Sequence, residues 1–92
     1  SGVVQMTKAM AVELADKGIR VNAIAPGYIK TDMNREFLES KSGERIMKRV
    51  PQKRFGEPQD LNGALFLLAS DCSNFMTGTV ITVDGGHLVS AL

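Results

Sequence analysis

The chain has 92 residues, 43% hydrophobic and 23% charged, which is ordinary for one small globular domain. Eleven Lys and Arg against ten Asp and Glu give a net charge of +1, which disfavours nucleic acid or an anionic membrane as the main partner. The longest apolar run, residues 64–69, falls far short of the ~20 residues of a membrane span. No signal-peptide pattern is visible, and the single cysteine, Cys72, excludes an internal disulfide, so we expect a cytoplasmic protein.

The first expected element is a helix over residues 2–17. Hydrophobic residues recur in it at spacings of three and four, Ser1 is a candidate N-cap, and Gly18 can take the left-handed conformation that ends a helix. Gly18 leads directly into residues 19–25, whose alternation predicts a strand. This strand is expected to stop at Pro26-Gly27.

The loop after this strand is the candidate ligand site, because ligands of open α/β sheets bind where loops leave the carboxyl ends of the strands. A proline-glycine turn lets the backbone approach a flat ring closely. Thr31 is expected to stand at the start of a new helix, where its hydroxyl either holds a polar or anionic group or only caps the helix.

Residues 31–50 carry only a thin apolar stripe, with a break at residues 40–43. We therefore expect two short helices, over residues 32–39 and 44–49. A charged, thinly anchored segment directly after a ligand loop is typical of a lid over a substrate. The alternative is a surface excursion without a role.

Glu57, Pro58 and Asp60 predict the start of another helix, whose apolar face ends near Ser70. The β-branched run over residues 80–83 predicts a strand buried on both faces of a parallel sheet. Two strands joined through a helix imply one right-handed βαβ unit. The predicted fold class is α/β, in the order helix, strand, lid helices, helix, strand.

Short motifs in this order and at these spacings resemble the C-terminal third of a short-chain dehydrogenase/reductase. They are S-G-V-V-Q-M-T-K at residues 1–8, R-V-N-A-I-A-P-G at 20–27, P-G-Y-I-K-T at 26–31, R-F-G-E-P-Q-D at 54–60, T-G at 77–78 and V-D-G-G at 83–86. The resemblance covers essentially the whole chain. It implies that residues 1–92 are a single C-terminal segment of a Rossmann-like, doubly wound parallel sheet in a dinucleotide-binding oxidoreductase domain.

The resemblance also implies a function, the NAD(P)-dependent interconversion of a hydroxyl and a carbonyl by hydride transfer. The substrate would be a small molecule, with gluconate-type sugar acids and 3-oxoacyl carrier-protein substrates as the two groups considered. The cofactor, NAD or NADP, would be bound by Pro26, Gly27, Ile29 and Thr31. Residues 31–50 would cover the substrate, and the turn at residues 84–86 would lie near a subunit interface.

We expect no catalytic residue in this chain. The family's catalytic Asn, Ser, Tyr and Lys, and its glycine-rich dinucleotide turn, would all precede Ser1. Tyr28, the only tyrosine, lacks the Tyr-x-x-x-Lys spacing, so it is not the catalytic acid. The 92-residue chain alone is therefore expected to be inactive and to bind no cofactor, and its residues do not choose between NAD and NADP.

A second hypothesis is a non-catalytic structural piece that associates with itself. The strand over residues 19–25 would lack a neighbour on one side, and the helix over residues 2–17 is apolar on more than one face. A homo-oligomer is expected under both hypotheses. No metal site is expected, because His87 is the only histidine and is more simply an exposed or interface residue.

Overall fold

The computed structural model of the chain describes residues 1–90, which fall into two units. The first unit consists of Ser1–Ala25 and Gly63–Thr82. The second consists of Pro26–Asn62 and the described residues from Val83 onward. In the part of the chain that the structure describes, no helix has the length and apolarity needed to cross a bilayer.

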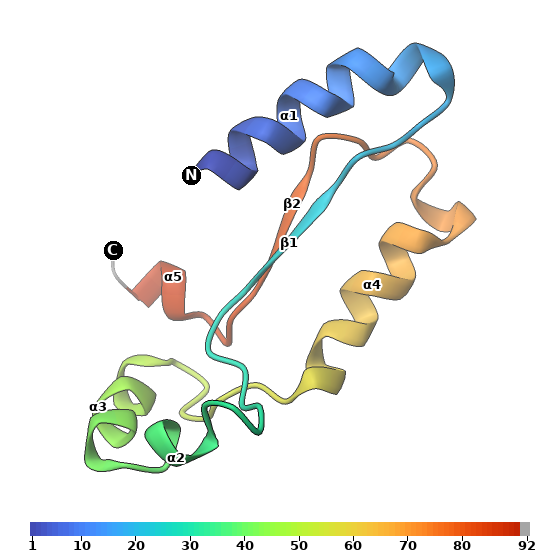
Figure 1. The fold of residues 1–92 in the computed structure, drawn as a ribbon. Helices are drawn as coiled ribbons and strands as arrows, with labels where there is room; N and C mark the ends of the chain where they lie inside the picture. The colour runs from blue at the N-terminus through green and yellow to red at the C-terminus, as the bar shows by residue number, and fades with distance from the viewer. Residues whose placement is uncertain (91–92) are drawn as a thin grey trace. The chain divides into compact units, whose positions relative to one another are not determined.

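The first unit opens with α1 (Gly2–Leu14), drawn in blue in Figure 1, and a tighter turn, η1 (Ala15–Lys17), follows it. The Ser1 hydroxyl caps α1 by accepting a hydrogen bond from the N–H of Val4 at 3.4 Å. Gly18 ends the helical segment in the left-handed region, with φ of 73°. Both predicted helix ends are thus confirmed.

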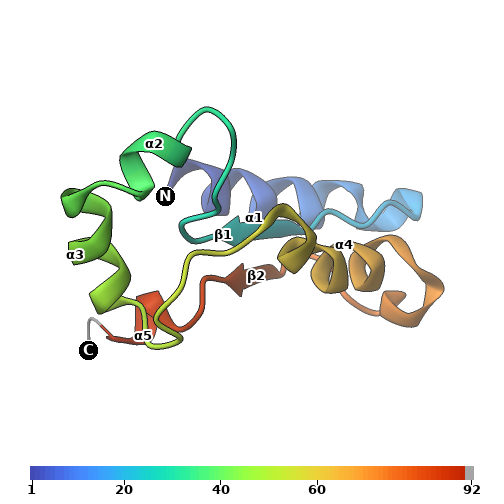
Figure 2. The same ribbon diagram turned by 90° about the horizontal axis from the view of Figure 1, so that it is seen from below.

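The strands β1 (Ala23–Pro26) and β2 (Val80–Val83) form a two-stranded parallel sheet. The N–H of Ala23 donates to the carbonyl of Thr79, and further along the N–H of Gly27 donates to the carbonyl of Val83, both at 2.9 Å. From the first bond to the second, the residue numbers increase on both strands, as they do in a parallel pair. Both arrows also point the same way in Figure 2. The strand predicted over residues 80–83 is confirmed, but its predicted burial on both faces is not: Thr82 is exposed and the other three residues are half-buried.

The first strand begins at Ala23, four residues later than the predicted range of 19–25. The reason is the side chain of Asn22, which donates to the carbonyl of Met76 at 3.1 Å and accepts from the N–H of Thr79 at 2.9 Å. These side-chain bonds interrupt the regular ladder at Asn22, although the N–H of Gly78 already donates to the carbonyl of Val21 at 2.8 Å, so the continuous strand starts only after Asn22.

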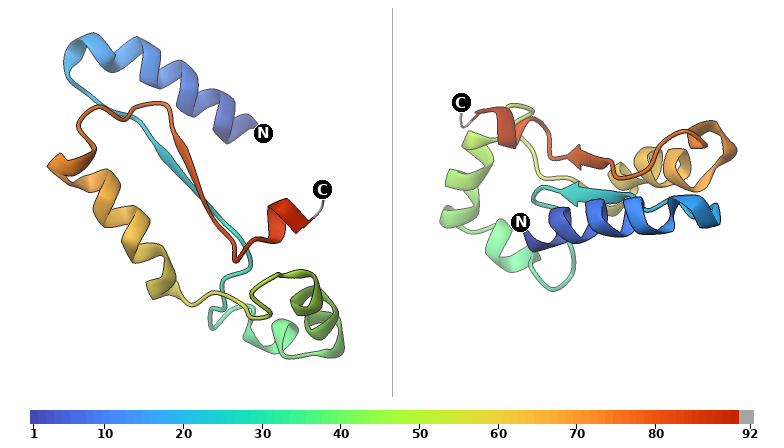
Figure 3. Two further views of the ribbon diagram at one scale, coloured as in Figure 1. Left: turned by 180° about the vertical axis from the view of Figure 1, so that it is seen from behind. Right: turned by 90° about the horizontal axis from the view of Figure 1, so that it is seen from above.

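The helix predicted from Glu57 starts as a tight turn, η2 (Pro58–Leu61), and continues as α4 (Asn62–Ala69). Its predicted end is confirmed, because Ser70 caps the next short turn, η3 (Asp71–Ser73). In the first unit, α1 and α4 flank the paired strands on opposite sides, as Figure 3 shows from behind.

Arg20 ties the C-terminal end of α4 to the segment that leads into β2. Its guanidinium donates at 2.8–3.4 Å to five oxygen atoms, the carbonyls of Leu68, Ser70, Ser73 and Met76 and the hydroxyl of Ser73. Ser73 is 1% exposed, so these bonds satisfy polar groups that water barely reaches. This clamp was not predicted from the sequence.

The second unit contains α2 (Arg35–Leu38), α3 (Lys41–Arg49) and the short α5 (His87–Ser90). Two short helices are confirmed between residues 31 and 50, but both begin elsewhere than predicted: α2 at Arg35 instead of residue 32, and α3 at Lys41 instead of residue 44, with its predicted end at residue 49 correct. The break lies at Ser40, whose hydroxyl caps α3 by accepting from the N–H of Gly43 at 3.3 Å. Residues 41–43, predicted as a break, are therefore the first turn of α3.

Candidate functional site

The four predicted cofactor-binding residues lie in the second unit: Pro26 is the last residue of β1, and Gly27, Ile29 and Thr31 lie in the loop that follows it. The first part of this loop lies against the end of β2. A Cβ added to Gly27 would stand 2.6 Å from the Cβ and 2.8 Å from the Cα of Asp84. Only glycine permits this approach, so the packing against Asp84 requires glycine at this position, in addition to the backbone turn.

Ile29 is the centre of an isolated parallel bridge with Gly56. The N–H of Gly56 donates to the carbonyl of Tyr28 at 2.9 Å, and the N–H of Lys30 donates to the carbonyl of Gly56 at 2.8 Å. In such a bridge the central residue's own N–H and carbonyl point away from the partner segment. Among residues 1–90, the N–H of Ile29 makes no hydrogen bond.

The side-chain amide of Asn34 joins two of the predicted residues. Its Oδ1 accepts from the N–H of Thr31 at 2.7 Å, and its Nδ2 donates to the carbonyl of Ile29 at 3.0 Å. A backbone N–H only donates and a carbonyl only accepts, so these two bonds determine which way the amide faces. Asn34 was missed from the sequence, where the one available signal was a polar residue three positions after Thr31.

Thr31 does not stand at the start of a helix, contrary to the prediction. The N-cap position of α2 belongs to Asn34, and Thr31 opens the turn before it, its carbonyl accepting from the N–H of Asn34 at 3.3 Å. The interpretation of Thr31 as a plain N-cap is therefore wrong. Its side chain is exposed, and its hydroxyl bonds to no other described residue.

Tyr28 anchors the loop through its ring. The ring meets Phe55, which is 6% exposed, edge-on at 6.3 Å, and meets His87 edge-on at 5.7 Å. His87 is therefore half-buried in packing, not an exposed side chain as one of its two sequence interpretations had it. Its Nδ1 is buried and has no hydrogen-bond partner among the described residues.

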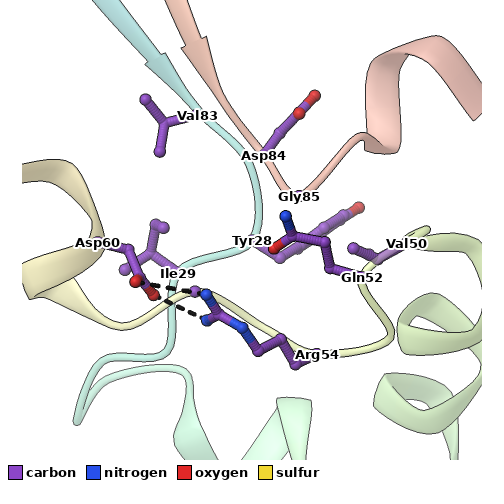
Figure 4. A pocket seen from close by; sticks show the side chains of 10 residues that line it. Tyr28, Ile29, Val50, Gln52, Arg54, Asp60, Val83, Asp84 and Gly85 are labelled. Carbon is purple, nitrogen blue, oxygen red and sulfur yellow. Dashed lines mark hydrogen bonds and ion pairs between the residues drawn. The ribbon is translucent and has the colours of Figure 1, made fainter. Parts of the chain in front are cut away.

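A small hollow of about 40 Å³ lies between the loop, the segment at residues 50–56 and the turn at 83–85 (Figure 4). It has room for about one water molecule, whereas small-molecule sites usually measure roughly 300 Å³ or more. The hollow is therefore too small for a substrate. A larger ligand of this loop would have to bind outside the hollow, where the N–H of Ile29 points away from Gly56 and makes no hydrogen bond among residues 1–90.

An ion pair at the edge of this hollow holds the segment that pairs with Ile29. Arg54 donates to the Asp60 carboxylate at 2.8 Å, and the N–H of Glu57 donates to the same carboxylate at 2.7 Å. The bond from Arg54, followed by that from Glu57, lowers the pKa of Asp60 below its ordinary value, and the same pair raises the pKa of Arg54. This contribution to stability is present above the pKa of an unfolded Asp and is lost as the pH falls through the lowered folded pKa.

Within residues 1–90, no group of three or more His, Cys, Asp or Glu side chains is close enough together to hold a metal ion. Cys72 is exposed, and nothing in its surroundings marks it as a nucleophile. The chemistry that the loop offers is hydrogen bonding by the backbone of Ile29 and the hydroxyl of Thr31. Such a set can both donate a hydrogen bond to a compact polar group and accept one from it.

Comparison with known proteins identifies relatives along nearly the whole chain. Residues 1–87 match the family model described as enoyl-(acyl carrier protein) reductase. The 3-oxoacyl-(acyl-carrier-protein) reductase FabG of Thermotoga maritima is 47% identical over 89 residues, covering 97% of this chain and 36% of the relative.

Two crystal structures of proteins from Agrobacterium tumefaciens are each 42% identical to the chain. A putative gluconate dehydrogenase gives a TM-score of 0.89 over 95% of this chain and 35% of its own. A putative 2-deoxy-D-gluconate 3-dehydrogenase with bound NADP gives 0.88 over 96% of this chain and 36% of its own. The chain thus spans about a third of the length of these relatives.

Proposed function

The chain belongs to the short-chain dehydrogenase/reductase family, and from this we propose that it serves as the nicotinamide-side part of an NAD(P)-dependent oxidoreductase. The whole enzyme would interconvert a hydroxyl and a carbonyl by hydride transfer. The observation that carries the proposal is the backbone of Ile29, held by its bridge to Gly56 with its N–H turned outward.

The loop suits the nicotinamide carboxamide, which presents one acceptor oxygen and one donor NH₂ group. The N–H of Ile29 would donate to the carboxamide oxygen, and the carbonyl of Ile29 would accept from the NH₂ through its second lone pair. Pro26 and Gly27 set the path of the chain into this position, and the exposed hydroxyl of Thr31 would bind the carboxamide or the pyrophosphate. When bound, the dinucleotide supplies the hydride.

We further propose that residues 31–50 form the lid over the substrate. The two helices of this segment, α2 and α3, pack on each other through the buried Leu38 and Gly43, so the segment can move as one piece. The relatives named for gluconate and for 3-oxoacyl substrates support the two substrate groups considered from the sequence. Either substrate would bind outside the small hollow, on the side of the loop toward which the N–H of Ile29 points.

The catalytic acid and base would come from outside these residues, so the 92-residue chain by itself should not turn over substrate. The proposal is therefore best tested in a chimera in which this chain replaces the matching third of Thermotoga maritima FabG. Such a chimera restores a complete enzyme around the loop. It also allows single residues of the chain to be varied.

In this chimera, Thr31→Val is expected to weaken NADPH or NADH binding about tenfold, because one hydrogen bond to a charged or polar group is lost while the side-chain shape is kept. Fluorescence titration measures the dissociation constant. Thr82→Val is the matched control, since Thr82 is also exposed and its hydroxyl bonds to no described residue. Equal cofactor affinities for the two variants would contradict the proposed role of the loop.

Self-association is the second candidate function, and the exposure of large apolar side chains favours it. In the first unit these include Val3, Met6, Val12, Phe66 and Phe75, each at least 57% exposed. The strand β1 also pairs with only one neighbour among the described residues, which leaves its other edge open. A homo-oligomer would cover both features.

Light scattering on the 92-residue chain is expected to give a mass of at least twice the 9.9 kDa of one copy. The reason is that one copy leaves this apolar surface in water. A dilution series should show the mass falling toward one copy as association is reversed by mass action. A mass of one copy at every concentration would contradict self-association.

A further inference from the structure

We propose that Asn34 is a positioning residue for the nicotinamide, an inference that rests on the function proposed above. One side-chain amide bonds the two loop residues on either side of Lys30, accepting from Thr31 and donating to Ile29. It is therefore a single group that holds the Ile29 carbonyl and the Thr31 backbone, the two parts of the loop next to the proposed cofactor contacts.

The hydrogen bond from Asn34 to Ile29 determines which lone pair of the Ile29 carbonyl oxygen is left for a ligand. A carbonyl oxygen has two lone pairs, and Asn34 Nδ2 occupies one of them at 3.0 Å. The second lone pair remains for the carboxamide NH₂. Because the first bond holds the plane of the peptide group that joins Ile29 and Lys30, it also fixes the direction of this second lone pair.

The bond to Thr31 determines which of its groups can reach a ligand. Its N–H is occupied by Asn34 Oδ1 at 2.7 Å and its carbonyl by the Asn34 N–H at 3.3 Å. Only the hydroxyl is left for the cofactor. Asn34 thus removes the backbone of Thr31 from ligand binding and leaves the side chain to do it.

The amide is well placed for this role, because Asn34 is half-buried and both of its polar atoms are used. A carboxylate in its place would still accept from Thr31 but would turn an oxygen toward the carbonyl oxygen of Ile29. Two acceptors facing each other repel, so the peptide group would rotate away from its position. Asn34→Asp therefore removes one of the two bonds selectively.

The experiment compares two ligands in the chimera described above. NADPH contains the nicotinamide, and 2′-phospho-ADP-ribose is the same molecule without it. Asn34→Asp is expected to weaken NADPH binding about tenfold and to change 2′-phospho-ADP-ribose binding less than about twofold. Asn34→Ala, which adds no charge, should show the same selective loss and covers the case in which Asn34→Asp fails to fold.

Asn74→Asp is the matched control, since Asn74 is exposed in the first unit and its side-chain amide makes no hydrogen bond to a described residue. Equal losses for both ligands would show a merely structural role and overturn the inference. If Thr31→Val weakens NADPH but both Asn34 variants bind like the control, the proposed function stands and the positioning role alone is wrong. If Thr31→Val also has no effect on NADPH binding, the result contradicts both the proposed function and the positioning role of Asn34.

Discussion

Replacing Gly27 by alanine is expected to destabilise the second unit by about 3 kcal/mol and to abolish measurable cofactor binding in the chimera. The new Cβ would lie 2.6 Å from the Cβ and 2.8 Å from the Cα of Asp84, and neither atom is the flexible end of a side chain. The two backbone segments must therefore separate, as in other overpacked sites. Their separation breaks the 2.9 Å bond from the N–H of Gly27 to the carbonyl of Val83.

Gly63→Ala is the matched control for this prediction, since a Cβ on Gly63 would meet no atom within 4 Å. Gly63 lies in α4, where alanine is the better helix former, so this variant should be more stable by about 0.5–1 kcal/mol. Urea unfolding followed by circular dichroism gives both values. If the two glycine variants unfold at the same urea concentration, the close approach to Asp84 does not prevent a larger residue from being accommodated at position 27.

The parts of the fold that the sequence predicted correctly are those that depend on neighbouring residues. The cap at Ser1 and the left-handed end at Gly18 are local, since each involves groups within four positions. The start of β1 could not be predicted in this way. It is set by Asn22 bonding to residues 76 and 79, far away in the sequence.

The same distinction applies to the candidate site. A strand ending in Pro26-Gly27 was enough to locate the loop. It was not enough to orient it, because the outward direction of the Ile29 N–H depends on the bridge to Gly56. The misplaced helix start at Thr31 has a related cause, since the amide of Asn34 pulls residues 31–34 into a turn that hydrophobic spacing does not reveal.

Arg20→Met is expected to lower the free energy of unfolding of the first unit by about 3 kcal/mol. Methionine keeps much of the apolar stem but donates no hydrogen bond, so four carbonyls and one hydroxyl lose the guanidinium that they share. Among them is the carbonyl of Leu68, in the last turn of α4, where no intrahelical N–H is available. Hydrogen bonds from a charged donor contribute about 1.5–3 kcal/mol, and the five here are not additive because they share two nitrogen atoms.

Arg20→Lys tests whether the shape of the guanidinium matters beyond its charge. An ammonium group reaches fewer of the five oxygens at once, so less than half of the lost stability should return. Arg35→Met serves as the control, because Arg35 is exposed and its one ion pair among the described residues, at 3.5 Å, is with a fully exposed Asp32 side chain. Its urea midpoint should match that of the unmodified chain. Equal midpoints for Arg20→Met and Arg35→Met would show that the carbonyls at the end of α4 are satisfied without Arg20, and that the clamp does not hold the first unit together.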